Sequence, residues 1–337
     1  MTILMAIESS CDETACALIK DGREILSSVV SSQINIHTLY GGVVPEVASR
    51  IHVENISIVI TDALKQAGIT MDEVDGIAFT QGPGLIGSLH VGVQAAKTIA
   101  WLYHKPLIPV NHLCGHIYAN RFVEELKFPM MALLISGGHT ELVWMKNDWD
   151  FKIIGTTWDD AIGEAYDKVS RILGLGYPGG PVIDRIAKEG KPHYTLPVPK
   201  TANPYDFSFS GLKTAVLQLI QREEKKGNPI IKEDLAYAFQ ETALQSMVKK
   251  TVDAVKEYHP EMLVLGGGVA ANSRLRVLIQ KACDDIDGLQ LIIPPMKYCT
   301  DNAAMIGAAG YVAYQHGMFG DFSLSADPGM EMPGENE

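Results

Sequence analysis

The chain has 337 residues, of which 28 are Lys or Arg and 40 are Asp or Glu, so its formal net charge at pH 7 is −12. This acidic balance excludes a generic basic nucleic-acid binder. With 47% hydrophobic and 20% charged residues, the composition is typical of a folded globular chain and excludes extensive disorder.

The two halves of the chain repeat one order of predicted elements. Two strands flank a small polar turn, and further along a buried strand leads into glycines and a helix. The expected strands lie at 5–7, 15–19 and 76–80 in the first half, and at 130–135, 142–145 and 262–265 in the second. We interpret the shared order as an internal duplication, and the mixture of strands with helices predicts an α/β fold in both halves.

Two segments between these strands have a distinct pattern. Apolar residues recur near helical spacing over 46–67, which predicts an amphipathic helix whose apolar stripe faces either the core or a partner protein. Four prolines interrupt 188–209, so we expect an inserted loop there.

Charge is unevenly distributed along the chain. The segment 185–232 carries nine basic and four acidic residues, and we expect any polyanion to contact this basic insertion. Residues 321–337 carry five acids and no base. We therefore expect a flexible acidic tail over 323–337.

A GxGxxG string occupies 82–87, between an expected strand and an expected helix. A dinucleotide site also needs an acidic residue about 20 positions later, but no Asp or Glu occurs between Asp75 and Glu124. We therefore interpret the string as a tight strand-to-helix turn.

Two other glycine-containing turns are better candidates for a phosphate site, because small residues expose backbone N–H groups to an anion. They are Ser136–His139 and the run from Gly266 to Asn272. Each turn alone favours an ordinary structural turn. Their occurrence at matching places in a duplicated α/β chain favours nucleotide binding.

His112 and His116 are four residues apart, which places both imidazoles on one face of a helix. Asp301 lies in a short polar stretch between a strand expected at 291–293 and a helix expected at 303–314. Two His and one carboxylate leave coordination positions open and suit Fe(II) or Zn(II). A metallopeptidase is disfavoured, because Leu113 stands where the HExxH motif has its Glu.

Seven motifs together resemble the bacterial TsaD (Gcp/YgjD) family of tRNA N6-adenosine threonylcarbamoyltransferases, over about residues 3–319. They are IESSCDET at 7–14, GPGLIGS at 82–88, NHLCGH at 111–116, ISGGHT at 135–140, FSFSGLKT at 207–214, GGGVAAN at 266–272 and CTDNAA at 299–304. The resemblance implies a two-lobed actin, sugar kinase and Hsp70-like (ASKHA) fold of duplicated RNase H-like halves. We assign 1–110 with 303–322 to lobe I, and 111–302 to lobe II.

The resemblance also implies a reaction. The threonylcarbamoyl group of threonylcarbamoyl-AMP would pass to N6 of the adenosine 3′ of the anticodon in tRNAs that read ANN codons, releasing AMP. His112, His116 and Asp301 would hold one divalent metal, with Fe(II) favoured over Zn(II). Asp12 and Glu13 are candidate catalytic residues. The residues implied to bind the adenylate are Ile135, Ser136, Gly137, Gly138, His139, Asp167, Gly180, Asp184 and Asn272.

The family implies a paralogous partner, TsaB, and an ATPase, TsaE, while TsaC supplies the adenylate. Two other functions fit the residues less well: an ATP-dependent small-molecule kinase and a nucleotide-gated scaffold. No basic region precedes the apolar run at 3–7, and the longest uncharged stretch, 76–96, is too polar for a membrane span. We therefore expect a cytoplasmic protein without membrane contact.

Overall fold

The computed structural model describes residues 1–334, and these form two units. Unit 1 contains Met1–Leu126 and the chain from Thr300 onward, whereas unit 2 is Lys127–Cys299. Each unit has its own mixed sheet and its own hydrophobic core, and each is described separately below.

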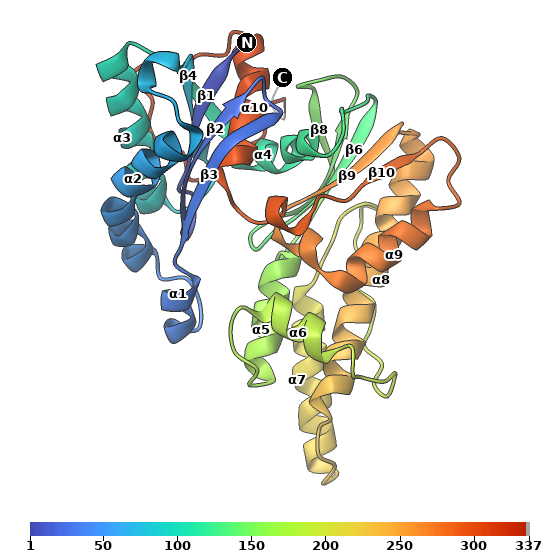
Figure 1. Cartoon of the computed structure of the whole chain (residues 1–337). Coiled ribbons are helices and arrows are strands. Elements are labelled where there is room, and N and C mark those ends of the chain that lie inside the picture. The colour runs from blue at the N-terminus through green and yellow to red at the C-terminus, as the bar shows by residue number, and fades with distance from the viewer. Residues whose placement is uncertain (335–337) are drawn as a thin grey trace. The chain divides into compact units, whose positions relative to one another are not determined.

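The sheet of unit 1 has the strand order β3-β2-β1-β4-β5 (Figure 1). Its strands are β1 (Ile3–Glu8), β2 (Glu13–Lys20), β3 (Glu24–Ser32), β4 (Gly76–Gly82) and β5 (Leu107–Asn111). β1, β2 and β3 pair antiparallel as a meander, and β4 and β5 extend the sheet in parallel from β1. All six residues of β1 are buried, because helices cover both faces of this central strand.

The helices of unit 1 form two layers around the sheet. They are α1 (Ile34–Tyr40), α2 (Pro45–Ala67), α3 (Ile86–Tyr103), α4 (His112–Tyr118) and α10 (Ala303–Gln315), with 3₁₀ turns at Met71–Glu73 and Ala119–Phe122. Val59 of α2 and Val93 of α3 join Met5 and Ile7 in one core. α10 packs on β1, β2, β4 and β5. A Cβ at Gly310 would lie 2.6 Å from Ala78 Cβ, so this helix lies directly on the strands.

Unit 2 repeats the same sheet order, β8-β7-β6-β9-β10, with the same antiparallel and parallel pairings. Its strands are β6 (Met130–Ile135), β7 (Thr140–Met145), β8 (Phe151–Thr156), β9 (Met262–Gly266) and β10 (Gln290–Ile292). The duplication inferred from the order of sequence elements is therefore confirmed in the topology of the two sheets.

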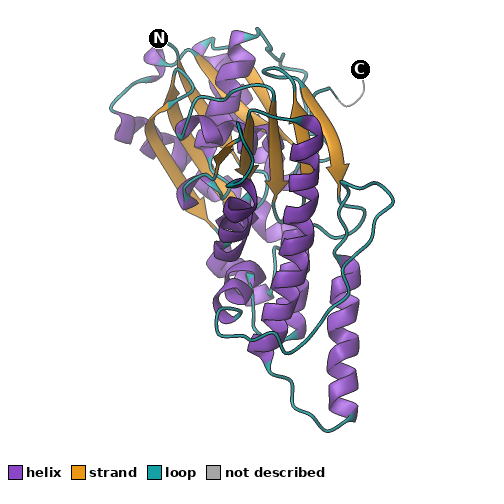
Figure 2. Cartoon of the chain, turned by 90° about the vertical axis from the view of Figure 1, so that its right-hand side faces the viewer, coloured by secondary structure: helices purple, strands orange, loops and turns teal. Residues whose placement is uncertain are grey.

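The helices of unit 2 build most of its core together with β6 and β9. They are α5 (Ile162–Ile172), α6 (Gly179–Ile186), α7 (Ser210–Lys225), α8 (Lys232–Tyr258) and α9 (Ser273–Cys283), with 3₁₀ turns at Gly268–Ala271 and Met296–Tyr298. α7 and α8 extend beyond the edge of the unit 2 sheet (Figures 1 and 2). The proline-containing segment 188–209 joins α6 to α7 without a helix or strand of its own, as expected.

The boundaries between the two units differ from the expected ones at residues 110 and 302. Unit 1 extends to Leu126, and the chain returns to it at Thr300. α4 belongs to unit 1 because it packs against α10, and Gly115 permits that contact. A Cβ at Gly115 would lie 2.8 Å from Ile306 Cδ1 and 3.2 Å from Met305 Cγ. The same packing explains why a helix tolerates glycine between the two histidines.

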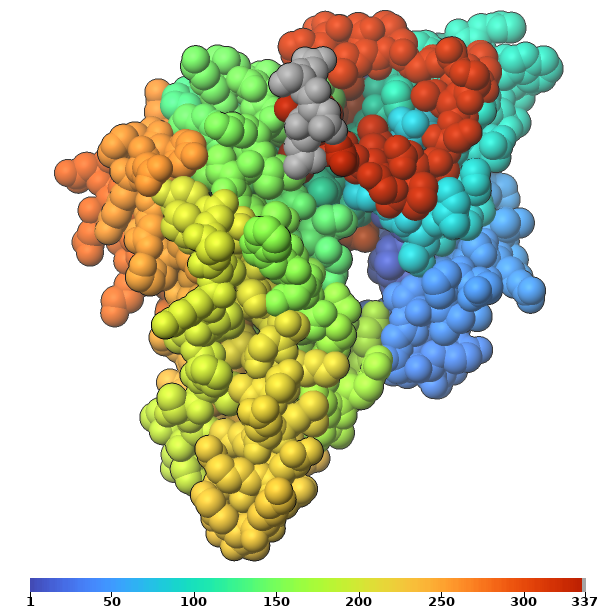
Figure 3. Space-filling model, turned by 180° about the vertical axis from the view of Figure 1, so that it is seen from behind, coloured from blue at the N-terminus to red at the C-terminus, as the bar shows by residue number. Residues whose placement is uncertain are grey.

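The expected flexible tail instead makes contacts with unit 1 as far as Glu331 and has a buried Met332, and residues 335–337 lie outside the described residues. Met332 is buried, and Asn111 Nδ2 donates to the carbonyls of Met330 (3.2 Å) and Glu331 (3.0 Å). The red C-terminal chain covers the cyan region around β4 and α3 in Figure 3. Backbone carbonyls and apolar side chains of this segment contact unit 1. These contacts hold the segment in place although its composition is acidic.

The same segment explains the GxGxxG turn. The N–H of Asp327 donates to the carbonyl of Gln81 (2.9 Å), and a Cβ at Gly82 would overlap the carbonyl of Asp327. A Cβ at Gly84 would lie 2.5 Å from the carbonyl of Ser10. Gly82 and Gly84 therefore permit the backbone at Asp327 and at Ser10 to approach the end of β4 and the turn that follows it. This agrees with the interpretation as a tight turn.

Within residues 1–334, no helix is both long enough and apolar enough to cross a membrane.

Candidate metal centre and nucleotide-binding turns

The metal candidates of α4 are placed by the start of that helix. Asn111 is its N-cap, and Asn111 Oδ1 accepts hydrogen bonds from the N–H groups of Leu113 (2.8 Å) and Cys114 (3.4 Å). The helix therefore begins at His112, and His116 lies one turn later on the same face. Their rings approach edge to face, with centroids 4.7 Å apart.

Asp301 completes the group from the chain that leads into α10. Its Oδ1 lies 3.5 Å from His112 Nε2 and 3.2 Å from His116 Nε2. One ligand atom from each residue lies within 4.8 Å of the others, and both histidines are buried. The structure thus brings together the three residues expected to bind a metal.

The donor set fits a divalent transition metal. Both ring nitrogens of His116 are buried and have no hydrogen-bond partner among the described residues. Nε2 of His116 is close to Asp301 but is not aligned for a hydrogen bond. A buried imidazole without partners is costly unless a ligand satisfies it. Two imidazoles and a carboxylate with open positions suit Fe(II) or Zn(II).

Glu8 and Ser10 lie behind His112, and neither was assigned a role from the sequence. Glu8 Oε2 is 3.0 Å from His112 Nδ1, and Ser10 Oγ is 3.1 Å from the same nitrogen. Glu8 ends the buried strand β1, 104 residues away from His112 in the chain. An acidic residue at the end of an otherwise apolar strand is the signal that could have identified it.

The carboxylates control the protonation of this group. Burial alone would lower the pKa of His112, but Asp301 and Glu8 raise it to about 9. Burial would likewise raise the pKa of Glu8, yet the charge of His112 holds it below its usual value. In the metal-free chain His112 is therefore cationic at neutral pH. A bound metal cation would take the place of that proton.

The candidate catalytic residues Asp12 and Glu13 lie where β1 turns into β2. Glu13 Oε1 accepts a hydrogen bond from Ser32 Oγ at 2.9 Å. Burial, together with the charges of Asp301 and Asp12, raises the pKa of Glu13 to about 9. Glu13 is therefore protonated at neutral pH in the metal-free chain. The backbone of Asp12 is fixed by a hydrogen bond that its carbonyl accepts from the N–H of Gln33 at 3.0 Å.

In unit 2, Ser136 to His139 form the turn between β6 and β7, directly after the buried Ile135. The N–H of Ser136 donates to the carbonyl of His139 (2.9 Å), and the N–H of His139 donates to Ser136 Oγ (3.0 Å). The turn is therefore closed on itself, and its two glycines stand at the tip.

The glycines around this turn fall into two groups. Gly163, Gly179 and Gly267 are required by packing, because a Cβ on any of them would clash with backbone atoms. The open group has nothing within 4 Å of an added Cβ and no positive φ; it comprises Gly137, Gly138, Gly180 and Gly268. The fold does not demand glycine at these four positions, which leaves room for a ligand next to the backbone.

Two of the packed glycines, Gly163 and Gly267, lie against the β6–β7 turn. A Cβ at Gly163, at the start of α5, would lie 2.6 Å from the carbonyl of Ser136. At Gly267 it would meet the carbonyl of Ile135. The open Gly137 and Gly268 therefore belong to turns that touch one another within unit 2.

The remaining adenylate candidates make hydrogen bonds within unit 2. Asp167 accepts from the N–H of Gly179 (2.6 Å), and Asp184 accepts from the N–H and the hydroxyl of Ser273 (both 3.1 Å). Asn272 caps α9 and donates to Gln240 Oε1 at 3.0 Å. Burial raises the pKa of Asp167. These bonds place all three side chains near the first turns of α6 and α9.

Comparison with solved structures supports the fold class. Thermococcus kodakarensis HypF matches 94% of this chain and 48% of its own, with a TM-score of 0.65 and 14% identity. Component A of the Acidaminococcus fermentans (R)-2-hydroxyglutaryl-CoA dehydratase matches 93% of this chain and 97% of its own, with a TM-score of 0.54 and 15% identity. The chain thus has the ASKHA type of fold, with two related α/β units.

Comparison of sequences defines the family. The model for "TsaD: tRNA N6-adenosine threonylcarbamoyltransferase" matches residues 24–308. Curated enzymes of that name are 51% identical in Bacillus cereus, over 98% of this chain and 97% of the relative, and 50% identical in Bacillus subtilis, over 98% and 95%. The chain therefore belongs to the tRNA N6-adenosine threonylcarbamoyltransferase family and is a transferase that acts in tRNA modification.

Proposed function

We propose that the protein transfers the threonylcarbamoyl group of threonylcarbamoyl-AMP to N6 of the adenosine 3′ of the anticodon in tRNAs reading ANN codons, and that it releases AMP in the cytoplasm. The observation that carries this proposal is the convergence of the buried His112 and His116 with the half-buried Asp301 in a chain of this family. The unpartnered nitrogens of His116 support a metal-assisted reaction.

His112, His116 and Asp301 would hold one divalent metal, with Fe(II) favoured over Zn(II). When bound, such a metal supplies Lewis-acid stabilisation of negative charge on a carbonyl or phosphate oxygen. In the metal-free chain, burial and the charges of Asp301 and Asp12 raise the pKa of Glu13 to about 9, so Glu13 would be a proton-carrying group beside the metal ligands. Its role, and that of Asp12, would be to donate or accept that proton as the amine of adenosine attacks.

In unit 2, the open turns would bind the adenylate. The glycines at 137 and 138 leave the β6–β7 turn free to offer N–H groups to the phosphate. Gly268 and Gly180 leave comparable room at the start of a 3₁₀ turn and of α6. Asp184 and Asp167 keep carboxylate lone pairs for ribose hydroxyls beyond the bonds that they already accept.

Release of labelled AMP tests this proposal. The full chain with TsaB, TsaE and threonylcarbamoyl-AMP should release AMP in proportion to added tRNA. The double variant His112→Ala, His116→Ala should lose most of that release, whereas His104→Ala changes an exposed histidine outside the group and should retain it. Full activity of the double variant would contradict the metal role, and AMP release independent of tRNA would contradict the transfer.

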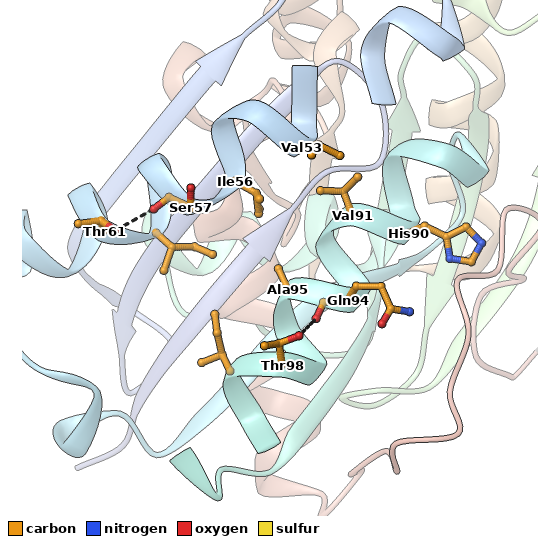
Figure 4. Close-up of a pocket in the computed structure, with 11 residues that line it drawn as sticks. Val53, Ile56, Ser57, Thr61, His90, Val91, Gln94, Ala95 and Thr98 are labelled. Atoms are coloured by element: carbon orange, nitrogen blue, oxygen red, sulfur yellow. Dashed lines mark hydrogen bonds between the residues drawn. The ribbon is translucent and has the colours of Figure 1, made fainter. Parts of the chain in front are cut away.

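For the paralogous partner TsaB we propose a groove between α2 and α3. Its volume is about 660 Å³, and Figure 4 shows side chains of both helices around it. Val53 is 64% exposed, and Ile56 and Ile60 are half-buried, so the apolar stripe of α2 is only partly used by the core. Apolar area at the centre of such a groove is what a stable protein interface needs.

A capture assay tests this partner. Val53→Glu combined with Ala95→Glu places two charges in the groove and should abolish capture of purified TsaB. Ile58→Glu is the matched control, because Ile58 is 56% exposed on α2 but does not line the groove. Unchanged capture by the double variant would refute the assignment. TsaE would act with this pair, and TsaC would supply the adenylate.

For tRNA we propose the basic insertion 185–232. Lys191 and Lys200 are exposed in its loop, and Lys213 lies half-exposed on α7. Reversing these three to Glu should weaken tRNA-dependent turnover at least tenfold and flatten its salt dependence, because phosphate contacts are lost. The control reverses Lys152, Lys249 and Lys256, three exposed lysines of unit 2 outside the insertion. Equal effects of the two triple variants would contradict this placement.

A further inference from the structure

We propose that Glu8 is a positioning residue for the metal centre, which fixes the tautomer of His112 so that Nε2 carries the ligating lone pair. The inference rests on the proposed metal site and assigns a role to a residue that touches no substrate. It explains why a strand of the unit 1 core ends in a fully buried carboxylate.

Among the described residues, Ser10, Thr80 and His112 contact the carboxylate of Glu8. Oε1 accepts from the N–H of Ser10 at 2.5 Å, and Oε2 accepts from Thr80 Oγ1 at 2.6 Å. Oε2 also lies 3.0 Å from His112 Nδ1. Thr80 and Ser10 therefore hold the carboxylate in one orientation, and its remaining contact is with the imidazole.

An ionised carboxylate can only accept hydrogen bonds. Nδ1 must therefore carry a hydrogen when it contacts Glu8. When a metal takes the place of one proton of the His112 cation, the ring keeps a single N–H. With that hydrogen held on Nδ1 by Glu8, Nε2 is the bare nitrogen that faces the metal. Nε2 is also the atom that lies 3.5 Å from Asp301 Oδ1, on the side where the three candidate ligands converge.

Ser10 cannot perform this selection. Its hydroxyl lies 3.1 Å from the same Nδ1, but a hydroxyl donates and accepts equally well and so permits either tautomer. His116 has no residue that selects its tautomer, because neither of its ring nitrogens has a hydrogen-bond partner among the described residues. Selection of a histidine tautomer at this site therefore depends on the contact between Glu8 and His112.

Carboxylates that orient a ligating histidine typically raise metal affinity 10- to 100-fold. Glu8→Gln keeps the size of the side chain, but its amide can both donate and accept, so the tautomer is no longer selected. Ser10→Ala is the matched control, because it removes a contact to the same nitrogen and leaves the carboxylate in place. The proposal therefore predicts different metal affinities for two variants that each remove a contact to Nδ1 of His112.

The experiment titrates Co²⁺ alone into the full chain, without substrate, and follows ligand-field absorption and the dissociation constant. The expected result is about 10- to 100-fold weaker binding for Glu8→Gln and a smaller loss for Ser10→Ala, which leaves the carboxylate on Nδ1. Far-UV circular dichroism and cooperative unfolding of each metal-free variant establish that it is folded. Equal affinity of folded Glu8→Gln and wild type would overturn the proposal.

A second measurement needs no variant. In the Zn²⁺-loaded wild type, ¹⁵N NMR of His112 should show a protonated Nδ1 and a metal-bound Nε2. Coordination through Nδ1 would overturn the inference about Glu8 while leaving a metal site in place. If the wild type binds neither metal, the proposed metal site fails, and the role of Glu8 fails with it.

Discussion

The open and packed glycines of unit 2 predict opposite consequences for one small substitution. Gly137→Ala adds a methyl group that meets nothing within 4 Å. Gly163→Ala adds one that lies 2.6 Å from the carbonyl oxygen of Ser136 and 2.8 Å from Gly137 Cα. We expect the first to impair nucleotide binding without loss of stability, and the second to impair stability.

The magnitudes follow from these distances. For Gly137→Ala the free energy of unfolding should change by no more than about 0.5 kcal/mol, or rise slightly, because an unstrained alanine restricts the unfolded chain. For Gly163→Ala, overpacking against backbone costs about 1–3 kcal/mol, from which about 1 kcal/mol of improved helix propensity in α5 is subtracted. The expected net loss is about 1 kcal/mol, and at most about 2 kcal/mol.

The binding effect of Gly137→Ala follows from the proposed phosphate contact. A methyl group at the turn would displace the phosphate from at least one N–H, and a hydrogen bond to a charged group contributes about 1.5–3 kcal/mol. AMP should therefore bind about 10- to 100-fold more weakly. Gly211→Ala is the control, because Gly211 has equal room but lies in α7.

Thermal unfolding and calorimetric titration with AMP measure the two quantities on the same samples. If Gly137→Ala binds AMP as tightly as wild type, the β6–β7 turn does not contact the nucleotide. If Gly163→Ala is as stable as wild type, the close contact between α5 and this turn does not constrain the fold. Loss of binding by Gly211→Ala would mean that the effect is not local to the turn.

Two further predictions concern stability. Met332→Ala should lower the free energy of unfolding by about 2 kcal/mol, because Met332 is 3% exposed in the C-terminal segment on unit 1; urea unfolding checks this, and a change below about 0.5 kcal/mol would mean that the segment is not bound in solution. Burial would raise the pKa of Glu241, but its hydrogen bonds with Arg274 (2.5 and 2.8 Å) and Gln245 hold it below its usual value. The pair therefore stabilises the fold above about pH 4.5 and loses this effect as pH falls further, so the deficit of Arg274→Met should shrink from pH 7 to pH 3.5. A deficit that does not vary with pH would refute this.

The order of the elements could be predicted because each signal is local. The apolar run of β6 was located at 130–135, where the structure has the strand, and α2 begins one residue before the predicted helix, at Pro45. The duplication was also readable, because both halves repeat the same order of turns and strands. The pairing of His112 with His116 needed only helical spacing.

The contacts that complete the metal group could not be predicted in the same way. Glu8 reaches His112 across 104 residues, and only the parallel alignment of β1, β4 and β5 brings the two together. Glycine has a low helix propensity, but the close packing of Gly115 against α10 outweighs that preference. Neither effect is visible in a window of neighbouring residues.

The C-terminal segment shows the limit of composition as a guide. Its acidic residues suggested a flexible tail. The segment is instead held by hydrogen bonds to its backbone carbonyls and by the burial of Met332, and neither can be inferred from side-chain charge. Asn111 caps the helix of His112 and also binds this segment, so the two features are linked through one side chain.

The most direct test of the central claim is mass spectrometry of nucleosides from an ANN-decoding tRNA transcript, after incubation with this chain, TsaB, TsaE and threonylcarbamoyl-AMP. We predict up to one threonylcarbamoyladenosine per tRNA, located 3′ of the anticodon, and its loss when that adenosine is replaced. No modified nucleoside, under conditions in which the Bacillus subtilis relative modifies the same transcript, would contradict the proposed function.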